Sequence, residues 1–116
     1  MTRAMIVYKI FRADEFAAFT NTGESLGAPV DLSDGYIHLS TRDQAPGTLA
    51  KHFAGEEKLM VLALEAETLG DALRWEPSRD GMLFPHLYRP LRPSDVAWSA
   101  PVLMYNGRHI LPQAPT

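Results

Sequence analysis

The dipeptide Asn106-Gly107 is the feature that most limits how this chain can fold. It separates two short segments of strand-forming residues, 102–105 and 108–111. Asn-Gly readily adopts the two left-handed conformations of a type I′ turn, which joins neighbouring antiparallel strands. The sequence therefore predicts a β-hairpin close to its C-terminal end and a fold that contains antiparallel sheet.

Segments rich in β-branched and other apolar residues predict the remaining strands. These segments are residues 5–10, 36–40, 58–64, 73–76 and 96–100. Residues 58–64 are mostly apolar, which is typical of a strand in the middle of a sheet. Residues 84–88 are bounded by prolines and are expected to be extended or looped.

Two short helices are expected between these strands. The first covers residues 14–19, and the second runs from near Thr41 to Gly55, where Thr41 and Gln44 have the spacing of a capping box. Residues 23–34 contain several turn-forming residues and are expected to be a loop. Few helices and six or seven short strands together predict an α+β domain rich in antiparallel sheet.

Composition and charge exclude several classes of protein. The chain is 46% hydrophobic and 22% charged, with 11 basic and 14 acidic residues and a net charge of −3. These values are typical of one globular domain, expected over residues 1–111 and followed by a flexible tail at 112–116. No apolar run is long enough to span a membrane, so we expect a cytoplasmic protein that does not associate with membranes. No run of basic residues indicates binding to nucleic acid. The absence of cysteine excludes disulfides and thiolate chemistry.

Alternation along residues 36–40 places three polar side chains on one face of a strand. Tyr36, His38 and Ser40 point away from the apolar pair Ile37 and Leu39. A histidine titrates near neutral pH, so His38 could bind an anion, donate a hydrogen bond or move a proton. A structural histidine bonded to the backbone is an equally good interpretation.

Two further places carry polar groups suited to chemistry. Glu76 ends a short strand, where its carboxylate could bind ribose hydroxyls or stabilise a developing cation; a surface ion pair is the alternative. His86 and Tyr88 lie two apart in the proline-bounded segment and offer a ring and a hydroxyl, unless the segment only packs. His38, Glu76 and His86 could together suit zinc or iron in a metal-dependent hydrolase. Their wide spacing in the sequence gives no support for that site, so we expect no metal.

Residues 34–41, Trp75-Glu76 and residues 84–88 occur in an order that resembles a small bacterial family called domain of unknown function 952. The resemblance runs from about Tyr8 to about Val96. The Ile-His-Leu-Ser strand, the helix after it and the strand at 61–66 are more distantly similar to the RNA 2′-phosphotransferases. That similarity implies an ADP-ribosyltransferase-like fold, with two small, mainly antiparallel sheets framing a cleft that binds NAD.

The second resemblance implies a site and a function. The cleft is expected to bind NAD, ADP-ribose or a related nucleotide, with NAD as a substrate if ADP-ribose is transferred. The catalytic residues would be His38, Glu76 and His86, and the ligand-binding residues would be Tyr8, Lys9, Tyr36, Ser40, Thr41 and Tyr88. Lys51-His52 lies near the position of a basic pair in that family. A non-catalytic module that binds a nucleotide or a protein is the alternative, because the arginines of the phosphotransferases have no evident counterpart. The sequence specifies no protein partner.

Overall fold

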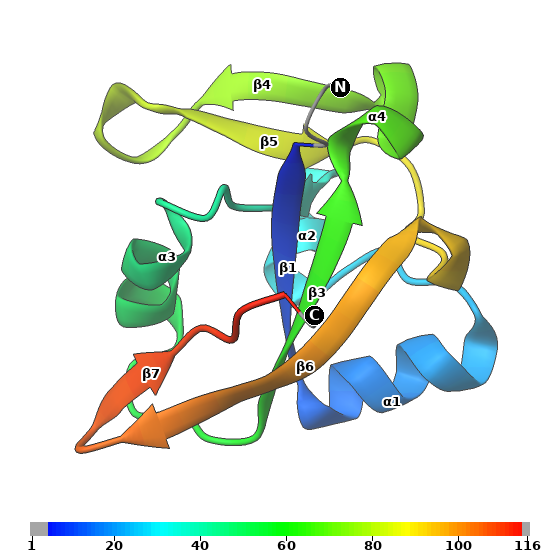
Figure 1. The fold of residues 1–116 in the computed structure, drawn as a ribbon. Helices are drawn as coiled ribbons and strands as arrows, with labels where there is room; N and C mark the ends of the chain where they lie inside the picture. Colours follow the sequence, from blue (N-terminus) through cyan, green and yellow to red (C-terminus); the bar gives the residue numbers. More distant parts are fainter. Residues whose placement is uncertain (1–4, 115–116) are drawn as a thin grey trace.

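The computed structural model describes residues 5–114, which form two twisted sheets with short helices around them (Figure 1). The strands are β1 (Ile6–Arg12), β2 (Ile37–His38), β3 (Leu59–Glu65), β4 (Leu73–Pro77), β5 (Leu83–Leu87), β6 (Val96–Tyr105) and β7 (Arg108–Ile110). The helices are α1 (Ala13–Thr22), α2 (Pro29–Asp34), α3 (Ala45–His52) and α4 (Ala66–Leu69), with 3₁₀ turns at Gly70–Ala72, Arg79–Gly81 and Pro93–Asp95. The fold is therefore of the mixed α+β class. No helix in the described range has the length and apolar character needed to cross a membrane.

The strands form a four-stranded sheet in the order β1-β3-β6-β7 and a three-stranded sheet in the order β2-β5-β4. Every strand pair is antiparallel. β3 lies inside the first sheet, which explains why almost all of its side chains are apolar and buried. The predicted hairpin is confirmed as β6–β7, with φ values of 51° at Asn106 and 77° at Gly107.

Alternate residues of β1 enter two separate cores. Val7 and Phe11 pack in a cluster that includes residues of α1 and of the second sheet. Tyr8 and Ile10 pack on the other face, in a cluster that includes residues of α3. Lys9 lies between Val7 and Phe11, so alternation directs a charged side chain toward the first core, where it is 5% exposed.

The expectation of two helices is wrong in number, because the described part of the chain contains four α-helices. Residues 23–34, expected to be a loop, contain α2. Pro29 opens this helix, the Asp31 carboxylate accepts the backbone N–H of Ala28 at 2.7 Å, and Gly35 ends the helix with a φ of 86°. The proline and glycine that suggested a loop are the start and stop signals of a short helix.

The tail expected to be loose over residues 112–116 is held at its first residue. Nη1 of Arg42 donates a hydrogen bond of 2.9 Å to the carbonyl oxygen of Pro112. Residues 115–116 lie outside the described range. The start of the tail is therefore part of the folded domain.

The segment after α2 joins the two sheets. β2 pairs with β5, so that His38 lies opposite His86. Two residues later, Ser40 exchanges two backbone hydrogen bonds with Tyr8 on the free edge of β1, at 2.7 and 2.9 Å. Nζ of Lys9 also lies 3.3 Å from the carbonyl oxygen of His38. His38 is thereby fixed where the two sheets meet.

Candidate functional site

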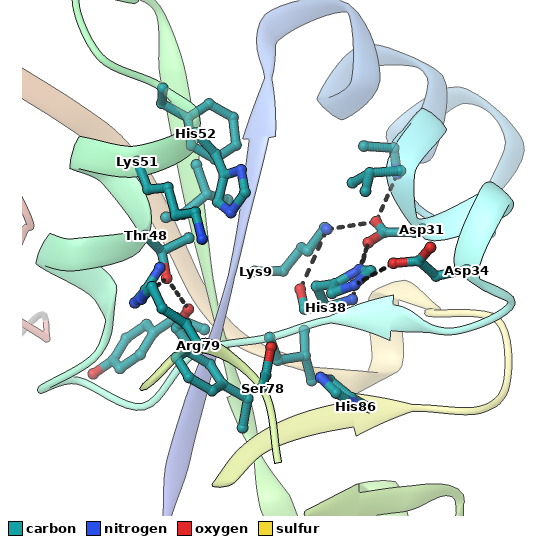
Figure 2. A pocket seen from close by; sticks show the side chains of 18 of the residues that line it. Lys9, Asp31, Asp34, His38, Thr48, Lys51, His52, Ser78, Arg79 and His86 are labelled. Carbon is teal, nitrogen blue, oxygen red and sulfur yellow. Dashed lines mark hydrogen bonds and ion pairs between the residues drawn. The ribbon is translucent and has the colours of Figure 1, made fainter. Parts of the chain in front are cut away.

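Asp31 is the centre of a chain of charged side chains beside this junction (Figure 2). Its Oδ2 accepts a hydrogen bond of 2.6 Å from Nζ of Lys9, and its Oδ1 lies 2.5 Å from Nδ1 of His38. The other ring nitrogen of His38, Nε2, lies 2.9 Å from Oδ2 of Asp34. Each ring nitrogen of His38 therefore faces a carboxylate oxygen, and an ionised carboxylate only accepts hydrogen bonds.

The surroundings of Asp31 keep its carboxylate ionised. Burial alone would raise its pKa, but the hydrogen bond from His38 and the charge of Lys9 outweigh burial and lower the pKa of Asp31 to about 2. The backbone N–H groups of Ala28 and His38 donate to the same carboxylate, at 2.7 and 3.0 Å. His38 therefore has a structural role in addition to the ligand contacts that the sequence suggests.

Three basic side chains, Lys51, His52 and Arg79, lie across from this acidic group, and we call them the cationic wall. Lys51 and His52 occupy the last turn of α3, and Arg79 begins the 3₁₀ turn after β4. Figure 2 shows Lys51 and Arg79 on the same side of the cavity as Thr48, opposite Asp31 and Asp34. None of the three forms an ion pair with another residue in the range 5–114. Burial and the positive charges of Lys51, Arg79 and His38 lower the pKa of His52. The charges of Lys51 and Arg79 are thus not balanced by a carboxylate partner within the described residues.

The guanidinium of Arg79 is positioned by weak contacts. It lies 5.0 Å from the ring centroid of Phe84, and its Nη2 is 3.5 Å from Oγ1 of Thr48. The Thr48 hydroxyl is in turn 2.9 Å from Oγ of Ser40. A Cβ atom on Gly47 would come within 3.0 Å of Nη2 of Arg79, so the glycine leaves room for the guanidinium. The hydrogen-bonding capacity of Arg79 is mostly unused.

The outer face of the second sheet carries a separate polar and aromatic cluster. Oε1 of Glu76 accepts a hydrogen bond of 2.7 Å from the Tyr88 hydroxyl and lies 2.8 Å from Nδ1 of His86. These two contacts, that of Tyr88 first, lower the pKa of Glu76. The ring of Tyr36 stacks on that of His86, with centroids 4.2 Å apart and planes 25° apart. Glu76 and Tyr36 therefore hold His86 from its edge and from its face.

A cavity of about 570 Å³ lies between α2 and α3 at the free edge of β1. Five of the nine predicted site residues line it, namely Tyr8, Lys9, His38, Ser40 and His86. The other four, Tyr36, Thr41, Glu76 and Tyr88, are not among its lining residues. Thr41 instead exchanges capping hydrogen bonds with Gln44 at the start of α3, and Tyr36 and Tyr88 line a second cavity of about 320 Å³. The structure therefore brings five of the nine predicted site residues to one cavity and leaves the other four outside it.

Sequence reasoning missed several residues that line the same cavity. These are Asp31, Asp34, Thr48, Ser78, Arg79 and the Lys51-His52 pair, which the resemblance had pointed to only loosely. One signal was available, because Lys9 falls between two core residues of β1 and a buried ammonium needs an acidic partner. A second was the spacing of Thr48 and Lys51 in α3, which places both on one face.

The histidines and carboxylates of the site do not form a metal-ligand set. Within residues 5–114, no group of three or more His, Asp or Glu side chains is arranged to hold a metal ion. Both ring nitrogens of His38 already contact carboxylates, and Nδ1 of His86 contacts Glu76. The geometry does not supply the ligands that a metal-dependent hydrolase built on His38, Glu76 and His86 would require.

Comparison with known proteins identifies the family. Residues 10–99 match the family model described as protein of unknown function (DUF952). The chain belongs to this family. A crystal structure of protein CC0527 from Caulobacter crescentus is 47% identical and has a TM-score of 0.86, with 90% of this chain and 92% of that chain covered. The solution NMR structure of CC0527 is 46% identical and has a TM-score of 0.80, with 90% of each chain covered. No curated protein matches this chain.

Family membership, predicted from the sequence, is thus confirmed, and the DUF952 fold is shared with CC0527. The more distant similarity to ADP-ribosyltransferases stays a prediction. Neither the family nor the fold carries an activity, so function has to rest on the site.

Proposed function

We propose that the cavity binds a phosphate-bearing small molecule of the class that includes ADP-ribose and NAD. The observation that carries this proposal is the cationic wall, in which Lys51 and Arg79 lie near the ring of His52 and none of the three has a carboxylate partner among the described residues. An anion in the cavity balances the charges of Lys51 and Arg79, and a phosphate oxygen accepts the hydrogen bonds that Arg79 leaves unused.

The remaining lining residues fit a ligand larger than phosphate alone. The volume of about 570 Å³ is within the range of small-molecule sites and exceeds what an inorganic ion fills. The hydroxyls of Ser40 and Thr48 line the cavity, and whichever of them accepts in their mutual hydrogen bond can donate to a further phosphate oxygen. His86 lines the cavity away from the wall and offers a polar group to the rest of the ligand.

Calorimetric titration tests this proposal. The wild-type chain is titrated with ADP-ribose, with NAD and with adenosine, which has no phosphate. We expect ADP-ribose and NAD to bind, adenosine to bind far more weakly, and affinity for the first two to fall as ionic strength rises. Equal affinity for adenosine, or affinity that is insensitive to salt, would contradict a phosphate site.

Transfer of ADP-ribose from NAD is a second candidate, favoured by the carboxylates that line the same cavity. In that reaction the bond between ribose C1′ and nicotinamide breaks, nicotinamide leaves with the electron pair, and an acceptor oxygen bonds to C1′ as its proton is lost. The sugar passes through a cation that a nearby carboxylate stabilises. Asp34 lines the cavity and its side chain is 42% exposed, whereas Glu76, which we expected in this role, does not line it. Release of nicotinamide by the wild type and its loss in Asp34→Asn would support transfer. Binding without release would support the non-catalytic module.

A further inference from the structure

We propose that His86 reads a hydroxyl group of the bound ligand, with Nε2 as the hydrogen-bond acceptor and Glu76 as the residue that fixes the ring in this state. This proposal rests on the phosphate site proposed above and narrows its ligand to a phosphate that also carries a sugar hydroxyl. A ribose-containing nucleotide satisfies both conditions, whereas inorganic phosphate or pyrophosphate satisfies only the first.

The tautomer of His86 follows from its contact with Glu76. Nδ1 lies 2.8 Å from Oε1 of Glu76, and the same oxygen also accepts the Tyr88 hydroxyl. An ionised carboxylate only accepts, so the ring proton of a neutral His86 sits on Nδ1. Nε2 is then left with a free lone pair, and it acts as an acceptor and not as a donor.

The position of His86 leaves Nε2 open to the cavity. His86 is 2% exposed and lines the cavity. Within residues 5–114, Nε2 of His86 forms no hydrogen bond. Every fully buried side-chain nitrogen or oxygen in that range has a hydrogen-bond partner, so Nε2 is not fully buried. Nε2 must therefore reach unoccupied space, and the cavity is the space that His86 lines.

The surroundings of His86 hold its ring in one orientation. Tyr36 covers one face at a centroid distance of 4.2 Å, and the His38 ring approaches edge-on at 5.4 Å. Glu76 is itself held by Tyr88, whose ring lies 5.1 Å from the Arg74 guanidinium. Rotation of the imidazole by half a turn would break the contact with Glu76. A ring fixed in this way can discriminate between a hydroxyl donor and a group that only accepts.

The other polar groups that line the cavity have different roles. The cationic wall supplies hydrogen-bond donors, which suit phosphate oxygens, and both ring nitrogens of His38 are occupied by Asp31 and Asp34. The Asp31 carboxylate is saturated by four hydrogen bonds. With its ring proton on Nδ1, His86 thus adds an imidazole acceptor on the side of the cavity formed by the second sheet. Its complement is a ligand hydroxyl.

Nitrogen-15 NMR of the histidine rings tests the proposal on the wild-type chain, with ADP-ribose and pyrophosphate as the two probes. We expect His86 to carry its proton on Nδ1, ADP-ribose to shift the Nε2 resonance, and pyrophosphate to shift resonances of the cationic wall but not Nε2. The side chain of Glu76 is partly exposed, so we expect variants at this position to stay folded. Glu76→Ala should lose the Nδ1-protonated form and weaken ADP-ribose binding about fivefold, the equivalent of one hydrogen bond. Glu76→Gln keeps an acceptor oxygen and should restore both properties.

Three results would overturn the proposal. A proton on Nε2 in the free protein contradicts the acceptor role, whatever binds. Wall resonances that respond to ADP-ribose while Nε2 does not would remove His86 from the ligand contacts and leave the phosphate site standing. No response of any resonance to either probe would overturn the phosphate site and this inference together.

Discussion

Lys9 and Asp31 form an ion pair in which Nζ and Oδ2 are 2.6 Å apart and the two side chains are 6% and 0% exposed. The lysine comes from the core-facing side of β1 and the aspartate from α2, which follows 22 residues later. The pair attaches α2 to the first sheet. Because Asp31 also holds His38, it fixes the position of one wall of the cavity.

The first prediction is that Asp31→Asn destabilises the fold by about 3–5 kcal/mol. The amide has no charge to balance the buried Lys9, and its NH₂ group cannot accept the hydrogen bonds that one carboxylate oxygen accepts. Urea denaturation measures the free energy of unfolding. The double variant Lys9→Met with Asp31→Asn should cost less than the sum of the single variants, and strict additivity would show that the pair is not coupled.

The second prediction concerns acid stability. The pKa of Asp31 is lower in the folded protein, about 2, than its ordinary value of 3.8, so the folded state binds fewer protons. Its contribution to stability is present above about pH 4 and is lost as the pH falls toward 2, amounting to about 2 kcal/mol. The stability gap between wild type and Asp31→Asn should narrow by that amount between pH 4 and pH 2. A gap that does not change with pH would contradict the assignment.

The third prediction is that Arg79→Ala and Lys51→Ala each weaken ADP-ribose binding about tenfold or more, the loss expected for a hydrogen bond between charged groups. Neither residue forms an ion pair in the described structure, so the melting temperature should change little. Arg108→Ala is the matched control, because Arg108 is exposed on β7 and does not line the cavity. Equal losses in all three variants would indicate a general charge effect and not a site.

The fourth prediction separates stability from binding at one position. Gly47→Ala should stabilise the chain by up to about 1 kcal/mol, because alanine is the better helix former in α3. The added methyl group would lie 3.0 Å from Nη2 of Arg79 and displace the guanidinium. Calorimetry with ADP-ribose should therefore show weaker binding by a more stable protein. Unchanged affinity would mean that the site does not depend on this position of Arg79.

Local patterns in the sequence were sufficient for much of the fold. Asn106-Gly107 specified a hairpin because few dipeptides adopt two consecutive positive φ values. The alternation at Ile37 and Leu39 correctly placed both side chains in the core. Helix α2 could not be found from periodicity, since six residues are less than two turns, and its proline and glycine also fit a loop.

The site was only partly predictable because its contacts join segments that are distant in the chain. His38 was expected to be presented to the cleft, but its Nδ1 contacts a buried aspartate that no local pattern identifies. The cationic wall combines the end of α3 with the turn after β4, and only the fold brings Arg79 and Lys51 to the same cavity. Glu76 was correctly placed on the polar face of the second sheet. Its contact with His86 depends on the strand register between β4 and β5.

Amide NMR of the isotope-labelled chain during titration with ADP-ribose tests the central claim most directly. The account predicts shifts concentrated in residues 48–52, at Arg79 and around His38 and His86, with little change in β6 and β7. The absence of shifts at millimolar ADP-ribose, or shifts confined to the β6–β7 hairpin, would contradict a nucleotide site in this cavity.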